Sequence, residues 1–327
     1  MGVYIRSIGA YVPENRVTND DLTKLVDTSD EWIQSHTGIK ARHICAEDEV
    51  TSDLAVKAAE QAIERGGIAK DEIDMLVVAT ASPDYTGFPS TASIVQDKLG
   101  LEKAAAFDLV AGCTGFVYGL ETGRSLIEGG AFRNVLLIGV ETLSRITNWK
   151  DRNTCVLFGD GAGAVVLSPS MSEESGIIDS LLGSEGSGAQ HLVRRAGGSK
   201  EPIKLGSTKE EDLYIQMNGR QVYNFAVRVN TEVITTLLDR HQLTIDGISW
   251  IVPHQANIRI IQAAAGRLKI PMEKFFTNIH EYANTSAASI PIALNEMYET
   301  DKLQRGDLVL LTGFGAGLSY GGNLLKW

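Results

Sequence analysis

The two halves of the sequence repeat one order of segments. A helical stretch at 53–65 precedes an apolar run at 67–77, and a similar pair at 225–238 and 242–252 follows at an offset of 175 residues (from 67 to 242). Both halves then continue with a helix, a strand, a small-residue turn into a helix and a last apolar strand. Repeats of roughly 100 residues are much longer than those of solenoids, so the pattern predicts a duplicated domain.

The alternation of helical and apolar stretches predicts an α/β fold. Runs such as 73–79 are apolar throughout, as expected for strands in a sheet that is covered on both faces. We place the N-terminal half at 1–172 and the C-terminal half at 173–327. Glycine, serine and charged residues at 184–216 break the pattern and predict an insertion, partly loop. The later segments of the second copy are predicted as a helix, a strand, a turn and a last strand at 258–268, 275–276, 284–288 and 308–313.

The bulk composition limits the compartment and the partners. The 327 residues include three cysteines, none in a C-x-x-C pair, which argues against a disulfide framework or a metal site and favours a reducing cytoplasm. The N-terminus lacks a signal segment and no apolar run approaches membrane-spanning length. The net charge of −11 disfavours nucleic-acid binding. An acidic protein partner would therefore have to dock on a local basic patch.

Cys113 is the first candidate for chemistry. It follows the apolar run 104–110, lies in the small-residue corner Ala111-Gly112-Cys113-Thr114-Gly115, and precedes an amphipathic stretch that reaches about residue 128. The unpaired N–H groups and the helix dipole at a helix start lower the pKa of a thiol. The lower pKa favours the thiolate, which is the nucleophilic form. The alternative interpretation of Cys113 alone is a buried, inert cysteine.

The repeat brings two further polar residues to equivalent positions. His254 follows a buried strand of the second copy, and Asn284 holds the turn position that corresponds to Cys113. Binding sites gather at the carboxyl ends of strands in α/β folds, so the three residues form a candidate site. Taken singly, His254 would be a structural histidine and Asn284 a helix cap.

Together these motifs resemble the β-ketoacyl-acyl-carrier-protein synthases III of the thiolase superfamily. The similarity spans essentially the whole chain, in the motifs Ala-Gly-Cys-Thr-Gly-Phe around Cys113, Val-Pro-His-Gln-Ala-Asn-Ile-Arg around His254, Asn-Thr-Ser-Ala-Ala-Ser-Ile-Pro from Asn284, and the predicted strand 157–163. The resemblance implies a thiolase-like, five-layered αβαβα fold and a homodimer. It also implies condensation of an acyl-CoA primer with malonyl-acyl carrier protein, without a cofactor.

The resemblance assigns roles to the three residues. Cys113 would attack the acyl-CoA thioester and carry the acyl group. His254 and Asn284 would donate hydrogen bonds to the enolate that decarboxylation of the malonyl group leaves. The N–H groups of Cys113 and Ala316 would form the oxyanion hole, although the family more often has glycine at position 316.

The resemblance also implies residues for substrates and partners. Trp32 and Arg152 match residues that hold the CoA adenine, while His36 replaces the usual arginine and would weaken CoA binding. Asn257 would line the pantetheine tunnel, and Phe88 would reach the acyl pocket of the partner subunit. The residues expected to dock the acidic carrier protein are Gln255, Arg259 and Arg267.

Several alternatives remain open at this point. Thiolases have a second cysteine in the C-terminal glycine turn, and elongating synthases use a second histidine where this chain has Asn284. Plant-type polyketide synthases share Cys-His-Asn but are longer. A condensing enzyme of polyketide or secondary metabolism, a thioester hydrolase and a non-catalytic acyl-binding protein are the other candidates. The sequence does not predict which primer is used.

Overall fold

The computed structural model describes residues 2–170 and 175–327. Its strands are β1 (Gly2–Tyr11), β2 (Arg16–Thr18), β3 (Ala41–His43), β4 (Met75–Ala79), β5 (Ala105–Leu109), β6 (Val135–Thr142), β7 (Asp160–Ser170), β8 (Gly176–Ser184), β9 (Leu192–Arg194), β10 (Ile215–Met217), β11 (Trp250–Pro253), β12 (Leu308–Gly315) and β13 (Ser319–Lys326). Its helices are α1 (Asn19–Leu22), α2 (Asp30–Thr37), α3 (Thr51–Gly66), α4 (Thr91–Leu99), α5 (Gly115–Glu128), α6 (Arg152–Cys155), α7 (Gly219–Arg240), α8 (Ile258–Leu268), α9 (Ile279–Tyr282) and α10 (Ser289–Glu299).

Two mixed sheets repeat one strand arrangement. The first has the order β1-β7-β6-β4-β5, and the second has the order β8-β13-β12-β11. In both, the first three strands pair antiparallel and the next pairing is parallel. The strand predicted at 275–276 is wrong, because only an isolated parallel bridge joins Phe275 to Ile251. Likewise β7 begins at Asp160, three residues into the run predicted as a strand from 157. The predicted boundary at 172–173 lies outside the described residues.

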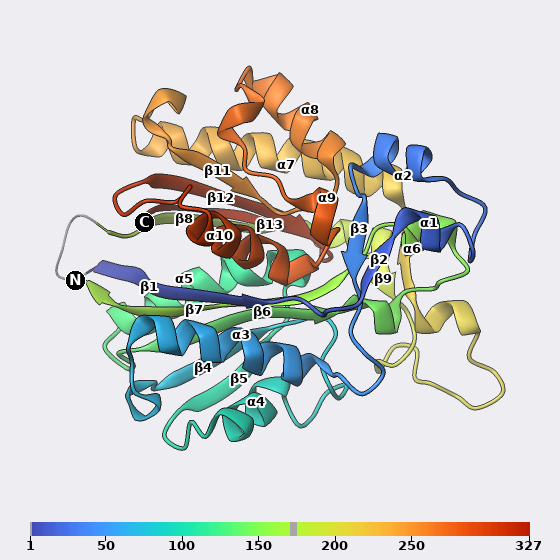
Figure 1. Ribbon diagram of the computed structural model, residues 1–327, viewed down its shortest axis with the longest axis horizontal. Helices are drawn as coiled ribbons and strands as arrows, with labels where there is room; N and C mark the ends of the chain where they lie inside the picture. Colours follow the sequence, from blue (N-terminus) through green and yellow to red (C-terminus); the bar gives the residue numbers. More distant parts are fainter. Residues whose placement is uncertain (1, 171–174) are drawn as a thin grey trace.

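The helices and sheets stack in five layers (Figure 1). Helices α3 and α4 cover the outer face of the first sheet, α5 and α10 lie between the sheets, and α7 and α8 cover the second sheet. The layers join because each helix buries an apolar or small-residue face, such as Leu54, Ala58 and Ala62 of α3. The predicted thiolase-like α/β layering is confirmed.

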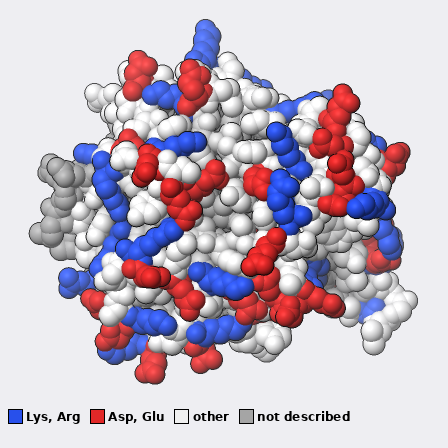
Figure 2. Space-filling view, in the orientation of Figure 1, with Lys and Arg blue, Asp and Glu red and all other residues white. Residues whose placement is uncertain are grey.

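Acidic and basic side chains are interspersed over most of the face in Figure 2. The net charge of −11 is thus not gathered there into one extended field. Within 2–170 and 175–327, no helix combines the length and the apolar character needed to cross a bilayer.

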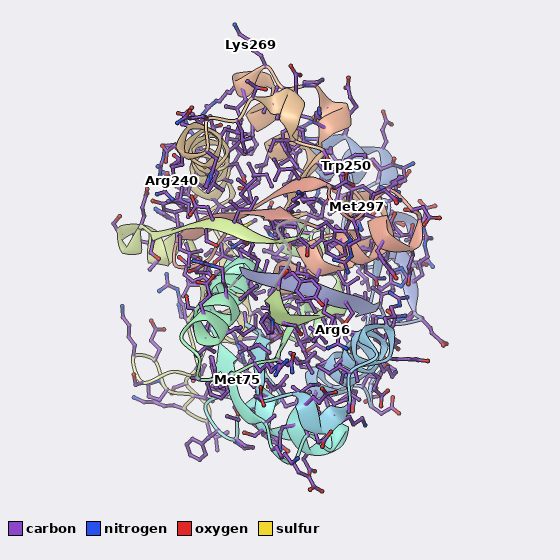
Figure 3. The ribbon with its side chains drawn as sticks, turned by 90° about the vertical axis from the view of Figure 1, so that its left-hand side faces the viewer. Arg6, Met75, Arg240, Trp250, Lys269 and Met297 are labelled. Carbon is purple, nitrogen blue, oxygen red and sulfur yellow. The ribbon has the colours of Figure 1, made fainter. Side chains whose placement is uncertain are left out.

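The parallel strands of both sheets run away from the side where the termini lie (Figure 1). Figure 3 views that starting side, with Met75 at the beginning of β4 and Trp250 at the beginning of β11. The carboxyl ends of both sets of strands therefore meet at the opposite side of the molecule. This is where the segments after β5, β6 and β11 come together.

The predicted insertion at 184–216 forms a small substructure, which contacts helix α7 through the turn η4 (Gly186–His191) and helix α6 through β10. It holds two 3₁₀ turns and the strands β9 and β10, which pair antiparallel as a sheet of their own. Leu192 of β9 and Met217 of β10 line the pocket described below. The insertion therefore contributes to the wall of the candidate site.

Candidate active site

Cys113, His254 and Asn284 line one pocket of about 220 Å3. Its wall comes from both halves of the chain and from the insertion. Most of the other lining residues are apolar or small, and they include Thr37, Val156, Leu157, Phe158, Leu192, Met217, Val222, Tyr223, Ala256, Ile260, Phe314 and Gly315. The structure therefore brings the three predicted residues to one apolar pocket, where hydrogen bonds are stronger than in water.

Cys113 lies in the 3₁₀ turn η2 (Gly112–Thr114), and helix α5 begins two residues later. Gly112 allows this turn because its φ of +54° favours glycine. Gly315 packs closely against the turn, since a Cβ on Gly315 would lie 2.6 Å from the Cys113 nitrogen. Burial raises the pKa of the Cys113 thiol to about 12, although a hydrogen bond with Ser286 lowers it. The predicted lowering of this pKa is therefore wrong, because burial has the larger effect.

His254 follows β11 and is 2% exposed. Its Nδ1 lies 2.6 Å from the Ser289 Oγ, while its Nε2 is buried without a hydrogen-bond partner among the described residues. Ser289 Oγ accepts from the Gln255 N–H at 3.3 Å, so its own proton is available to Nδ1. Burial lowers the pKa of His254 to about 3. These contacts favour a neutral imidazole that carries its proton on Nε2 and donates it into the pocket.

Asn284 is held in place by hydrogen bonds on both of its backbone groups. Its N–H donates to the Leu157 carbonyl at 2.9 Å, and its carbonyl accepts from the Gly159 N–H at 3.0 Å. The side-chain Oδ1 accepts from the Ser286 N–H at 2.8 Å. This bond orients the amide so that Nδ2 is the group left to donate to a ligand in the pocket.

The glycine turn after β12 packs against the cysteine turn. A Cβ on Gly112 would lie 3.1 Å from the Ala316 nitrogen, so this part of the turn contacts η2 closely. Gly315 and Phe314 line the pocket. Ala316 is not among the lining residues, so its place in an oxyanion hole stays a prediction. Phe314, which the sequence analysis missed, packs edge-on against His254 with 5.4 Å between ring centroids.

The residues predicted to bind CoA lie together. The His36 ring stacks on the Trp32 ring with 4.4 Å between centroids, and the Arg152 guanidinium lies 4.0 Å from the centroid of the same ring. Trp32, His36 and Asn257 line the pocket. The Asn257 side chain also caps α8 and donates to the His36 carbonyl at 3.0 Å. It therefore couples α8 to the helix that carries Trp32.

The residues predicted for carrier-protein docking differ in their exposure to solvent. Gln255 is 1% exposed, and its amide donates to the Pro253 and Phe276 carbonyls. Its prediction as a docking residue is therefore wrong, because a buried side chain cannot contact a partner. Arg259 and Arg267 are exposed on α8. They are about two turns apart, and Lys269 projects from the end of the same helix (Figure 3).

Phe88 is 88% exposed and does not line the pocket of its own chain. It lies in the loop between β4 and α4. Tyr85 in this loop and Val110 after β5 are exposed as well. The arrangement leaves Phe88 free to contact another molecule.

Comparison with known proteins establishes the family. Residues 107–186 match the family described as 3-oxoacyl-[acyl-carrier-protein (ACP)] synthase III, and residues 238–327 match its C-terminal family. The beta-ketoacyl-[acyl-carrier-protein] synthase III of Caldanaerobacter subterraneus subsp. tengcongensis is 49% identical over 324 residues, which cover 99% of this chain and 97% of that protein. The synthase III of Clostridium perfringens is 50% identical over 323 residues, 98% of each chain. The crystal structure of 3-oxoacyl-[acyl-carrier-protein] synthase III from Aquifex aeolicus VF5 has a TM-score of 0.92 and 44% identity, and covers 100% of both chains. The chain therefore belongs to the β-ketoacyl-acyl-carrier-protein synthase III family and, as its motifs predicted, is an acyl-transferring condensing enzyme.

Proposed function

We propose that this condensing enzyme transfers an acyl group from acyl-CoA to Cys113 and then condenses it with malonyl-acyl carrier protein, the initiating step of type II fatty-acid synthesis. The observation that carries this proposal is the arrangement of one pocket. It joins a nucleophile, Cys113, to two oriented donors, the Nε2–H of His254 and the Nδ2–H of Asn284.

The first half-reaction forms an acyl-enzyme. The Cys113 sulfur attacks the thioester carbonyl, the sulfur–carbon bond to CoA breaks, and CoA leaves. The carbonyl oxygen becomes negative on the way, and the N–H groups of Cys113 and Ala316 are the proposed donors to it. This half-reaction does not require the His254 donor.

The second half-reaction uses the other two residues. Loss of CO2 from the malonyl group leaves an enolate, and its oxygen needs hydrogen-bond donors in place of water. His254 and Asn284 present one donor each, and removal of one such donor typically costs about 10²–10³ in rate. The carbanion then attacks the acyl-Cys113 carbonyl and expels the thiolate. No step needs a resident cofactor, because the thioester and the two donors supply the chemistry.

The stack of His36, Trp32 and Arg152 is the proposed CoA site. An aromatic face with a guanidinium beside it suits a nucleotide base and its phosphates. Arg259 and Arg267 on α8 are the proposed contacts for the acidic carrier protein, since α8 begins beside the pocket-lining Asn257.

A homodimer is the proposed assembly. β5 is an edge strand of the first sheet. Its Phe107 is exposed, and Val110 just beyond the strand is 77% exposed. Pairing with a second copy would cover this apolar edge and would bring Phe88 to the partner's pocket. The free thiols of all three cysteines agree with the proposed cytoplasmic location.

The testing experiment follows Cys113 by intact mass. Incubation with acetyl-CoA should add one acetyl group to Cys113, and β-ketoacyl product should form only after malonyl-acyl carrier protein is added. Turnover to free acid would instead indicate a thioester hydrolase. If no primer acylates Cys113, the result would indicate a non-catalytic acyl-binding protein. A panel of straight and branched acyl-CoA primers then identifies the preferred chain, and mass photometry or light scattering measures the dimer.

A further inference from the structure

An arginine side chain is buried against the segment 156–159, beside the active site. Arg42 of β3 is 0% exposed. Its Nη1 donates to the Asn19 Oδ1 at 2.9 Å, and its Nη2 donates to the Val156 carbonyl at 2.9 Å. Both partners are neutral oxygens, and Nε has no hydrogen-bond partner among the described residues. A buried charge without a counter-charge is costly, and the two half-reactions above leave Arg42 without a task.

The segment 156–159 holds the backbone of Asn284. The first three residues of the segment line the pocket. The Leu157 carbonyl accepts from the Asn284 N–H at 2.9 Å, and the Gly159 N–H donates to the Asn284 carbonyl at 3.0 Å. A Cβ on Gly159 would lie 3.2 Å from the Arg42 Cβ, so Arg42 packs against this end of the segment and hydrogen-bonds its other end.

The backbone on both sides of Asn284 is strained. Ala283 has a φ of +55° and a ψ of −154°, and Ser286 has a φ of +49°. Non-glycine residues adopt such angles only when the surrounding structure imposes them. The turn that carries Asn284 therefore depends on its neighbours, and the hydrogen bonds to the segment 156–159 are part of that support.

We propose that Arg42 is a positioning residue for decarboxylation: its guanidinium fixes the Val156 carbonyl, and the segment 156–159 then holds Asn284 where its Nδ2 donates to the enolate oxygen. The proposal rests on the role of Asn284 in the function above. Arg42 is not among the residues that line the pocket, so it acts through this segment. A charged donor suits the task, because it makes a stronger hydrogen bond to a carbonyl than a neutral donor does.

The other hydrogen bond of Arg42 fixes the direction of its guanidinium. Asn19 is 1% exposed, and its Nδ2 donates to the Ile39 carbonyl at 2.7 Å and to the Asp30 Oδ1 at 2.9 Å. Its Oδ1 is thereby turned toward Arg42. Asn19 keeps both donor bonds when Arg42 is removed, so helix α2 of the proposed CoA site, which begins at Asp30, stays anchored. Acylation of Cys113 should therefore depend little on Arg42.

The first test is a double-mutant cycle. Arg42→Met keeps an unbranched side chain and removes every donor. It should lower CO2 release from malonyl-acyl carrier protein about tenfold, the effect of one hydrogen bond from a charged donor, while acylation of Cys113 stays within about twofold of the wild type. In an Asn284→Ala background, Arg42→Met should change CO2 release by less than about twofold, because the group that it positions is absent. The cycle is repeated with Arg42→Lys, which keeps the charge, so the test stands if Arg42→Met does not fold.

The second test measures hydrogen exchange of the full chain without substrate, by mass spectrometry on short peptides. In Arg42→Met the N–H groups of Gly159 and Asn284 should exchange at least about tenfold faster than in the wild type, whereas those of β4 should keep their rates. Arg305→Met is the matched control, because Arg305 also donates to two backbone carbonyls but precedes β12, at the side of the molecule opposite the pocket. It should leave these exchange rates and the ratio of the two half-reactions unchanged.

Three results would overturn the proposal. An equal loss of CO2 release in the wild-type and Asn284→Ala backgrounds would show that Arg42 does not act through Asn284. Equal losses in both half-reactions would show a general structural role. Wild-type exchange at Gly159 and Asn284 in the Arg42 variants would show that the arginine does not hold the segment. A wild type that releases no CO2 would overturn the proposed function instead, and the exchange rates would still decide whether Arg42 supports Asn284.

Discussion

The substitution Ser289→Ala removes the hydroxyl that orients the His254 ring and leaves the histidine itself in place. The Ser289 hydroxyl lies 2.6 Å from Nδ1, and both side chains are buried, so water cannot easily replace the lost contact. The hydrogen bond that stabilises the Nε2–H tautomer is worth about 1.4 kcal/mol, which corresponds to about a tenfold change in an equilibrium. We expect decarboxylation of malonyl-acyl carrier protein to fall by about tenfold. Acylation of Cys113 should stay within about twofold of the wild type, since Ser289 has no hydrogen bond with Cys113.

The assay measures CO2 release and acyl transfer separately, with the unfolding free energy from urea titration. Ser168→Ala is the matched control, because Ser168 is buried and donates to Asn134 at 2.7 Å far from the pocket. It should lower stability without changing the ratio of the two rates. A Ser289→Ala enzyme that decarboxylates at the wild-type rate would refute the tautomer argument. Equal losses in both half-reactions would refute it as well.

Three further predictions address other parts of the protein. His254→Ala or Asn284→Ala should each lower decarboxylation by about 10²–10³ while Cys113 is still acylated, measured by CO2 release and intact mass; equal loss of both steps would count against the division of roles. Arg259→Glu should raise the apparent KM for malonyl-acyl carrier protein several-fold, and an unchanged KM would exclude this helix as the docking surface. Glu141 has a pKa of about 7 in the fold against an ordinary value of 4.5, so the native state binds the proton more tightly and loses stability as the pH rises between these values. Compared with Glu141→Gln, the wild type should lose about 3 kcal/mol of unfolding free energy between pH 4.5 and pH 8, measured by urea titration, and parallel stability profiles would contradict the raised pKa.

Much of the fold and the family could be predicted from the sequence because their signals are local. Continuous apolar runs between amphipathic stretches predicted two similar α/β units, and the five-layered fold confirms the α/β class. The prediction of a strand at 275–276 was wrong. Two phenylalanines favour extended backbone, but a strand also needs a neighbouring strand that pairs with it over several residues. Here a single bridge to Ile251 is all that forms.

The sequence by itself determined which residue types could do the chemistry, namely a cysteine in a small-residue turn, a histidine after a strand and an asparagine in the matching turn. Only the tertiary structure decided their chemical state. The pKa of the Cys113 thiol rises because of desolvation, and the His254 tautomer depends on Ser289, 35 residues away. Gln255 is buried because its amide bonds the Pro253 and Phe276 carbonyls, which lie 23 residues apart in the sequence. Burial and hydrogen bonds between distant segments set charge and proton position, and no local pattern in the sequence encodes them.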